Sequence, residues 1–234
     1  VSMGRGSAAS ALYAAALGYN AVAAGSSSMA LVNSRAGSSG AFAAGIDNNT
    51  SSYGATGQNS VALGYQSKAS GQRAFSVGSG ADASGTQAIA LGGNTASGAY
   101  SLTAGGEAGT LTASGAYSAT IGGSVNTSSG EASYAFGKRA LAAQDGKYAY
   151  GAQLVSTTGA TQGGMMILVA ATTDATATIL RSDTNSADAD NQIVAAADTA
   201  ITFDGSVTGI QNGAQAFASF LISGLLVNDG GTTT

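Results

Sequence analysis

Residues 58–93 read "QNSVALGYQSKASGQRAFSVGSGADASGTQAIALGG", and this stretch decides the fold. One five-residue segment recurs in it every fourteen residues, as SVALG at 60–64, AFSVG at 74–78 and AIALG at 88–92. A second series of glycines lies half a period away from the glycines that end these segments. The two series are Gly64, Gly78 and Gly92, and Gly71 and Gly85. A fixed internal period predicts a repeat architecture, and two glycines per period predict two corners per repeat.

Each five-residue segment alternates large and small side chains, as in Val61, Ala62 and Leu63. Alternation with a period of two residues indicates a β-strand, and the short distance between corners leaves no room for a helix. Glycine suits the corners because it adopts positive φ angles and lets two backbones pass closely. The pattern extends over about residues 10–152, with further segments at 101–105, 118–122 and 133–137.

Stacked as parallel strands about 4.8 Å apart, these repeats predict an all-β roll of about ten coils. We expect the large members of each segment to fill the lumen and the small members to lie where neighbouring chains pack closely. The large members are Val61, Leu63, Phe75, Val77, Ile89 and Leu91, and the small members are Ala62, Ser76, Ala90, Thr103, Thr120 and Ala135. Two aliphatic side chains per coil are too few to offset the entropy lost in ordering a whole coil. We therefore expect a second buried face between copies of the chain, with a homotrimer as the natural closed form.

The stretch at 59–85, "NSVALGYQSKASGQRAFSVGSGADASG", resembles the head repeats of trimeric autotransporter adhesins, the YadA-like heads. The resemblance covers about residues 10–152. It implies a left-handed parallel β-roll, or solenoid, with coils of about fourteen residues, and a trimer. The chain departs from the pattern by extra residues between Gly45 and Gly64 and between Gly105 and Gly122. Such insertions predict surface loops.

The composition changes near residue 152. Residues 1–152 hold seven of the eight basic residues, five of the twelve acidic residues and all nine tyrosines. We therefore predict a repetitive roll at 1–152 and a β-sandwich-like C-terminal module at 153–234. Apolar runs at 165–170, 176–181, 200–207 and 216–227 predict the strands of this small antiparallel β domain. We expect the domain to close the open end of the roll, where strand edges would otherwise be unpaired.

The tail resembles a C-terminal β module of bacteriophage tail fibres. The resemblance rests on "TTDATATIL" at 172–180, "NQI" at 191–193 and "TAITFDGSV" at 199–207. It implies a phage fibre rather than an autotransporter. The opening "VSMGRGSAAS" and the final "NDGGTTT" suggest a segment of a longer protein.

The sequence predicts no catalytic, cofactor-binding or metal site. Because the chain has no histidine and no cysteine, it offers no Ser–His triad, cysteine nucleophile or thiolate metal site. The acids at 183, 188 and 190 could ligate calcium, but they lack the order of an EF-hand loop, which favours a solvated turn. Glycoside hydrolysis needs two close carboxylates. The acids of the first part fall on different coils: Asp47, Asp82, Glu107, Glu131 and Asp145.

Charge and hydropathy also bear on the partners. Neither part of the chain is basic enough to predict nucleic-acid binding. The most apolar run, at 216–227, is too short to predict membrane insertion.

The insertion "IDNNTSSYG" at 46–54 is the predicted receptor-contact loop. The loop combines polar groups with an aromatic ring, which suits binding to a sugar surface, and the residues are Asp47, Asn48, Asn49 and Tyr53. The alternative is a surface loop that the fold tolerates and that binds nothing. Tyrosines close to corners offer a lateral binding surface or simple packing. They are Tyr13, Tyr19, Tyr65, Tyr100 and Tyr117.

We predict a structural and host receptor-binding segment of a trimeric bacteriophage tail fibre, and not an enzyme. Its partners would be further copies of itself, other tail proteins, and a host cell-surface glycan or outer-membrane protein. Its location would be the extracellular virion tail. The alternatives are the head of a bacterial trimeric autotransporter adhesin, at the bacterial cell surface, and a polysaccharide-depolymerising tailspike.

Overall fold

The computed structural model describes residues 1–47, 52–106, 108–152, 156–172, 176–195, 199–210, 217–229 and 232–233. Every helix or strand assigned in these residues is a β-strand, which confirms the all-β prediction. The chain divides by its contacts into two units, Val1–Gln192 and Ile193–Thr234. The predicted boundary at residue 152 and the sandwich form of the second module stay predictions.

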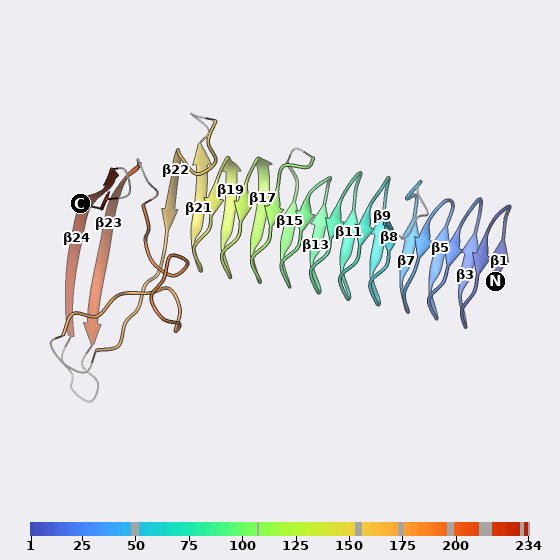
Figure 1. Ribbon diagram of the computed structural model, residues 1–234, viewed down its shortest axis with the longest axis horizontal. Coiled ribbons are helices and arrows are strands. Elements are labelled where there is room, and N and C mark those ends of the chain that lie inside the picture. The colour runs from blue at the N-terminus through green and yellow to red at the C-terminus, as the bar shows by residue number, and fades with distance from the viewer. Residues whose placement is uncertain are drawn as a thin grey trace. The chain divides into compact units, whose positions relative to one another are not determined.

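Parallel strands stack in the first unit as successive coils of a roll (Figure 1). Each coil gives one strand to sheet A, which has twelve strands, and one to sheet B, which has ten. The strands of sheet A are β1 (Ser2–Met3), β3 (Ala15–Leu17), β5 (Met29–Leu31), β7 (Phe42–Ala44), β9 (Val61–Leu63), β11 (Phe75–Val77), β13 (Ile89–Leu91), β15 (Leu102–Ala104), β17 (Ala119–Ser124), β19 (Tyr134–Lys138), β21 (Tyr148–Ala152) and β22 (Gln162–Met165). The strands of sheet B are β2 (Ala8–Ala9), β4 (Val22–Ala23), β6 (Arg35–Ala36), β8 (Gly54–Ala55), β10 (Lys68–Ala69), β12 (Asp82–Ala83), β14 (Thr95–Ala96), β16 (Thr112–Ala113), β18 (Thr127–Ser128) and β20 (Leu141–Ala142).

The strand register reproduces the sequence period. Phe75 pairs with Ile89, and Lys68 pairs with Asp82, both fourteen residues on. Backbone hydrogen bonds join each coil to the next: the amide of Phe75 donates to the carbonyl of Ala88 at 2.9 Å. The predicted parallel roll of about ten coils is therefore confirmed. Its left-handed sense and the trimer stay predictions.

The lumen of the roll contains the small side chains, so the prediction that the large side chains fill it is wrong. Ala62, Ser76 and Ala90 are fully buried at the middle of their strands. Phe75 and Ile89, beside them, face outward and are 38% and 39% exposed. The cause is the narrow coil: between strands that are mostly two or three residues long, the facing backbones leave room for small side chains, and the larger buried side chains, Ile46, Asn94, Leu111 and Asn126, lie just outside the strands. The same inversion holds for the remaining members of the segments, with Thr103, Thr120 and Ala135 buried.

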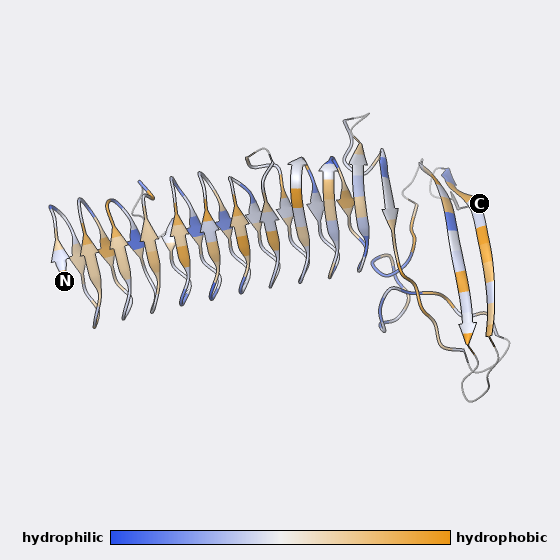
Figure 2. Ribbon diagram, turned by 180° about the vertical axis from the view of Figure 1, so that it is seen from behind, coloured by the Kyte–Doolittle hydropathy of each residue, from blue (hydrophilic) through white to orange (hydrophobic). Residues whose placement is uncertain are grey.

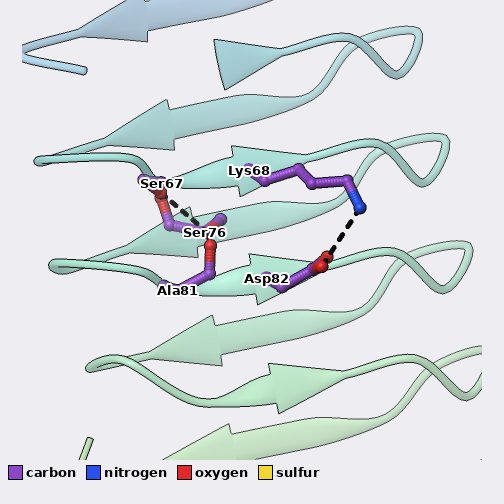
Figure 3. Close-up of polar contacts among 5 residues, drawn as sticks. All are labelled: Ser67, Lys68, Ser76, Ala81 and Asp82. Atoms are coloured by element: carbon purple, nitrogen blue, oxygen red, sulfur yellow. Dashed lines mark hydrogen bonds and ion pairs between the residues drawn. The ribbon is translucent and has the colours of Figure 1, made fainter. Parts of the chain in front are cut away.

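Most hydroxyl groups in the lumen find partners inside it, whereas Thr103 Oγ1 has none among the described residues. The Ser67 and Ser76 hydroxyls lie 2.8 Å apart, and Ser76 donates to the carbonyl of Ala81 at 2.9 Å (Figure 3). Thr120 and Ser128 form a similar pair at 2.6 Å. Hydrogen bonding removes most of the cost of burying these polar groups.

The two corner series use glycine for different reasons. Gly64, Gly78 and Gly92 follow sheet A strands and have φ values of 107°, 123° and 80°, in the region that favours glycine. A Cβ atom at Gly71 or Gly85, at the other corner, would overlap the carbonyl oxygen of the corner glycine in the next coil. The corner after each sheet A strand thus needs glycine for its positive φ angle. The other corner needs glycine because the backbones of two coils approach closely there.

The C-terminal end of the roll is closed within the first unit. Strand β22 pairs antiparallel with β21 and covers the edge of sheet A. At the edge of sheet B, the Gln162 side chain accepts from the Leu141 amide at 2.7 Å and donates to the Leu141 carbonyl at 3.0 Å. The Gln162 amide thus takes the place of another strand, so both edges have partners.

An antiparallel sheet forms the regular part of the second unit. It contains β23 (Thr199–Ile210), β24 (Phe217–Asp229) and β25 (Thr232–Thr233). The predicted antiparallel C-terminal domain is confirmed in this sheet, including strands in the runs at 200–207 and 216–227.

The other two strand predictions in the tail are wrong. The run at 165–170 contributes only its first residue to β22, and the run at 176–181 forms one antiparallel bridge, between Val169 and Arg181. Ile167 and Ile179 remain exposed. β-Branched composition favours strands only where a neighbouring edge is present to pair with.

We expect Gly71→Ala to lower the free energy of unfolding by about 3 kcal/mol, because its methyl group forces adjacent coils apart. The matched control is Gly163→Ala, where an added Cβ meets nothing within 4 Å. Urea denaturation followed by circular dichroism measures both. Equal stability of the two variants would contradict the close-approach role of this corner.

Candidate interaction surfaces

The outer face of sheet A is apolar along the whole roll. We call apolar face the residues on either side of the buried middle residue in each strand from β3 to β21. They are Ala15, Leu17, Met29, Leu31, Phe42, Ala44, Val61, Leu63, Phe75, Val77, Ile89, Leu91, Leu102, Ala104, Ala119, Ile121, Tyr134, Phe136, Tyr148 and Tyr150. None of them carries a charge, and most are partly or fully exposed in the single chain. A continuous uncharged strip of this length is typical of a protein–protein interface.

Aromatic residues occupy the last coils of the apolar face. The ring centroids of Phe136 and Tyr148 lie 4.8 Å apart, and those of Phe136 and Tyr150 lie 5.0 Å apart. A shallow concavity of about 390 Å³ lies beside them, lined by Ile121 and Tyr134 among others. It adjoins a register shift in β17 between Ile121 and Ser124. This end of the apolar face is therefore uneven, because the register shift interrupts the regular stacking of the coils.

The outer face of sheet B is polar over most of its coils, with the apolar Ala8, Val22 and Leu141 towards its two ends. Lys68 and Asp82 form an ion pair of 3.1 Å between neighbouring coils (Figure 3). Farther along the sheet, Thr95, Thr112 and Thr127 lie in register, each on the outward side of its strand. The two sheets thus give the roll one apolar side and one side suited to water.

The corner tyrosines are exposed on the flanks of the roll. Tyr100 and Tyr117 stack with ring centroids 4.9 Å apart and planes 5° from parallel. Each has a positive φ, and the amide of Tyr117 donates to the carbonyl of Ala99 at 2.8 Å, which holds adjacent coils together. The pair was not predicted because an insertion places the two residues seventeen positions apart. The sequence does contain a signal that could have predicted the pair: each tyrosine follows its corner glycine, Gly98 or Gly115, by two residues.

The other three corner tyrosines are exposed as well. Tyr13 lies before β3, Tyr19 follows β3, and Tyr65 follows β9. All three have at least half of their surface open to solvent. Exposed rings with a polar tip suit contact with another surface better than internal packing.

The predicted receptor-contact loop is placed only in part. Asp47 is exposed, and its Oδ1 accepts from the Asn33 side chain at 2.8 Å. Tyr53 is half-buried and packs against the alanine core. Asn48 and Asn49 lie outside the described residues. In the sequence, each insertion falls between a sheet A strand and the next sheet B strand, β7 and β8 for the first and β15 and β16 for the second.

Most acidic residues described in the roll lie apart from one another, and only Glu131 and Asp145 lie close together. Asp82 is in its ion pair, and Asp47 bonds to Asn33. Asp145 accepts from the backbone amide of Glu131 at 2.6 Å, so these two acids come from neighbouring coils at one corner. Glu107 lies outside the described residues.

Burial lowers the pKa of Lys147, whose ammonium donates to Gln144 at 2.9 Å.

Asp183, Asp188 and Asp190 lie in local turns. The Asp183 carboxylate accepts from the Asn185 amide at 3.0 Å and from the buried Asn191 side chain at 2.8 Å. Asp188 accepts from the amide of Asp190 at 2.9 Å. Within the described ranges, no group of three or more His, Cys, Asp or Glu residues is placed to hold a metal ion. The same part of the chain contains no helix able to span a membrane.

Comparison with known families identifies the repeat. The family model of the YadA head domain repeat matches residues 1–31, 55–81 and 69–95. The matched segments all lie in the roll and include the stretch with the clearest fourteen-residue period. No curated protein matches the chain. The roll therefore carries an adhesin-type repeat similar to that of YadA heads.

Proposed function

We propose that the chain is a structural and receptor-binding segment of a trimeric bacteriophage tail fibre. The observation that carries the proposal is the division of the roll into an apolar face on sheet A and a polar face on sheet B. The apolar face joins three copies into a rod, while sheet B and the corners remain in water and meet the host.

The apolar face supports self-association on energetic grounds. Its larger side chains, such as Phe75 and Ile89, keep more than a third of their surface exposed in the single chain. Covering the rest contributes about 1 kcal/mol per side chain, and the side chains with this exposure are Met29, Phe75, Ile89, Ile121, Tyr134, Tyr148 and Tyr150. YadA-type head repeats form homotrimers, which fits three copies facing one another across this surface.

The host contact lies on the sides that stay in water. Uncharged hydroxyl groups on sheet B and exposed tyrosines at the corners match the chemistry of a cell-surface glycan, because aromatic rings stack on sugars and hydroxyls bond to them. A loop region of an outer-membrane protein is the other receptor class. The proposal assigns the chain no catalytic step, so purified host glycan should keep its length after incubation with it.

Two carriers of the fibre compete. The C-terminal antiparallel sheet, together with the sequence resemblance at 172–207, favours a phage tail. The YadA-type repeat itself favours the head of a bacterial trimeric autotransporter adhesin. Both carriers place the chain outside the cell, and they differ in the particle that bears it.

Immunogold labelling with an antibody against this chain separates the two carriers. We expect gold on the tails of virions released from a lysed culture. Gold on bacterial envelopes, with bare virions, would contradict the phage proposal and support the adhesin. Preimmune serum is the control.

The stacked tyrosines provide a test of the receptor surface. We expect the double variant Tyr100→Ala, Tyr117→Ala to weaken binding to host cells about thirtyfold, the loss of about 2 kcal/mol typical of a central aromatic contact. The matched control is the double variant Ile167→Ala, Ile179→Ala, which removes two exposed side chains that lie outside sheet B and the corners. Unchanged binding of a double variant that keeps the circular dichroism of the parent chain would remove this pair from the receptor surface.

A further inference from the structure

One corner position of the roll forms a column of side chains that runs from coil to coil. It lies at the corner that follows each sheet B strand, and the amide of each member donates to a carbonyl of the preceding coil at 2.8 Å. Figure 2 shows hydrophilic colour at several of these corners, along the lower edge of the roll in that view. We call corner column the members in successive coils, which are Arg73, Gln87, Tyr100, Tyr117, Ala132 and Gly146.

The corner column changes from aromatic to very small side chains after Tyr117. The Tyr100 ring covers one face of the Tyr117 ring, with the planes 5° from parallel. On the other side of Tyr117, the next coil presents Ala132 and the coil after it presents Gly146, and both residues are exposed. Because neighbouring coils lie about 4.8 Å apart, the column carries no large side chain over about 10 Å beside the second face of Tyr117. We call this part of the column the step, and Tyr117 is 54% exposed beside it.

Two carboxylates come from the coils of the step. Glu131 directly precedes Ala132 and is exposed, and its carboxylate bonds to none of the described residues. Asp145 directly precedes Gly146, and its Oδ1 accepts from the Glu131 amide at 2.6 Å, which holds the Asp145 carboxylate against the coil of Glu131. Within the part of the chain that the structure describes, the one ion pair joins Lys68 to Asp82 in other coils. The step therefore combines an uncovered aromatic face with carboxylate oxygens that can still accept hydrogen bonds.

A neutral sugar ring suits these groups better than a charged ligand does. The C–H groups on one side of a pyranose ring pack against the electron-rich face of an aromatic ring, while its hydroxyls donate to acceptors at the rim. Hydrogen bonds to a carboxylate are about twice as strong as those between neutral groups. An ammonium group at the step would form exposed ion pairs, which contribute little in water. A sugar with its own carboxylate would be repelled by Glu131 and Asp145.

We propose that the step is a subsite for a neutral pyranose, which stacks on the uncovered face of Tyr117 and donates hydrogen bonds from its hydroxyls to the Glu131 carboxylate. The inference rests on the proposed function, because it names the class of sugar that the corner tyrosines contact on the host. Glu131 is then the residue that selects neutral sugars over anionic ones. Asp145 adds to this selection by placing a second negative charge in the next coil.

The corner column offers matched variants on the two sides of the tyrosine pair. Ala132→Arg places a guanidinium over the uncovered face of Tyr117, and Gln87→Arg places the same group beside Tyr100, away from the step. Both positions have the positive φ of Arg73 in the same column, so the backbone accepts arginine there. The probes are methyl β-glucopyranoside and methyl β-galactopyranoside, added to the full chain and followed by saturation-transfer difference NMR. We expect the parent chain and Gln87→Arg to saturate the ring C–H protons of the probes, and Ala132→Arg to abolish the signal.

A second pair of variants tests the selection by charge. We expect Glu131→Gln to bind the neutral probes about tenfold more weakly, because it loses the hydrogen bonds to a charged acceptor. The same variant should gain saturation of methyl β-glucuronoside, an anionic sugar that the parent chain leaves unsaturated. The matched control is Asp47→Asn, which removes an exposed carboxylate from another coil and should match the parent chain with every probe.

The remaining outcomes separate the subsite from the proposed function. Equal signals from Ala132→Arg and Gln87→Arg, or no signal from the neutral probes with the parent chain, would overturn the subsite. Saturation of methyl β-glucosaminide alone would overturn it as well, because that probe carries an ammonium group. Adhesion of the parent chain to host cells without a signal from the neutral probes would sink the subsite and leave the proposed function intact. A signal without adhesion would support the subsite and contradict the host contact.

Discussion

The narrow spacing between the two walls of each coil governs the rest of the structure. Parallel strands of two or three residues, joined by tight corners, leave a lumen that admits alanine, serine and threonine. Gly71 and Gly85 are glycine because neighbouring coils touch there. Buried hydroxyls such as those of Ser67 and Ser76 are tolerated because the same closeness gives each a partner. Within the strands the larger side chains point outward, and the larger buried ones, Ile46, Asn94, Leu111 and Asn126, lie just outside the strands.

Outward-pointing large side chains explain why the roll can serve as a fibre element. A core of alanine buries little apolar area per coil, so a single roll gains modest stability from its interior. In the proposed trimer, the apolar face on sheet A would supply a second core between copies of the chain. Stability and assembly would then come from one surface, and the polar outer face of sheet B and the corner tyrosines would be free to meet a receptor.

The period of the sequence predicts the coil length, the strand positions and both corner series, because glycine and two-residue alternation have few structural interpretations. It could not show which face of a strand lies inward. Alternation of Val61, Ala62 and Leu63 fits either direction, and the choice depends on the wall-to-wall distance, which is a property of the closed coil. The strands at 200–207 and 216–227 are predicted by their composition, but the equally β-like run at 176–181 lacks an edge to pair with. Tyr100 and Tyr117 stack because their coils remain neighbours in spite of the insertion between the two residues.

Sedimentation equilibrium of two matched lysine variants shows whether copies of the chain associate through the apolar face. Leu91→Lys puts a charge on the apolar face of sheet A, and Thr95→Lys puts it on the outer face of sheet B in the same coil. We expect the Thr95→Lys chain to sediment with three times the 22.3 kDa mass of one chain. We expect Leu91→Lys to convert these trimers towards single chains. A parent protein of 22.3 kDa in solution, or dissociation caused by Thr95→Lys and not by Leu91→Lys, would contradict it.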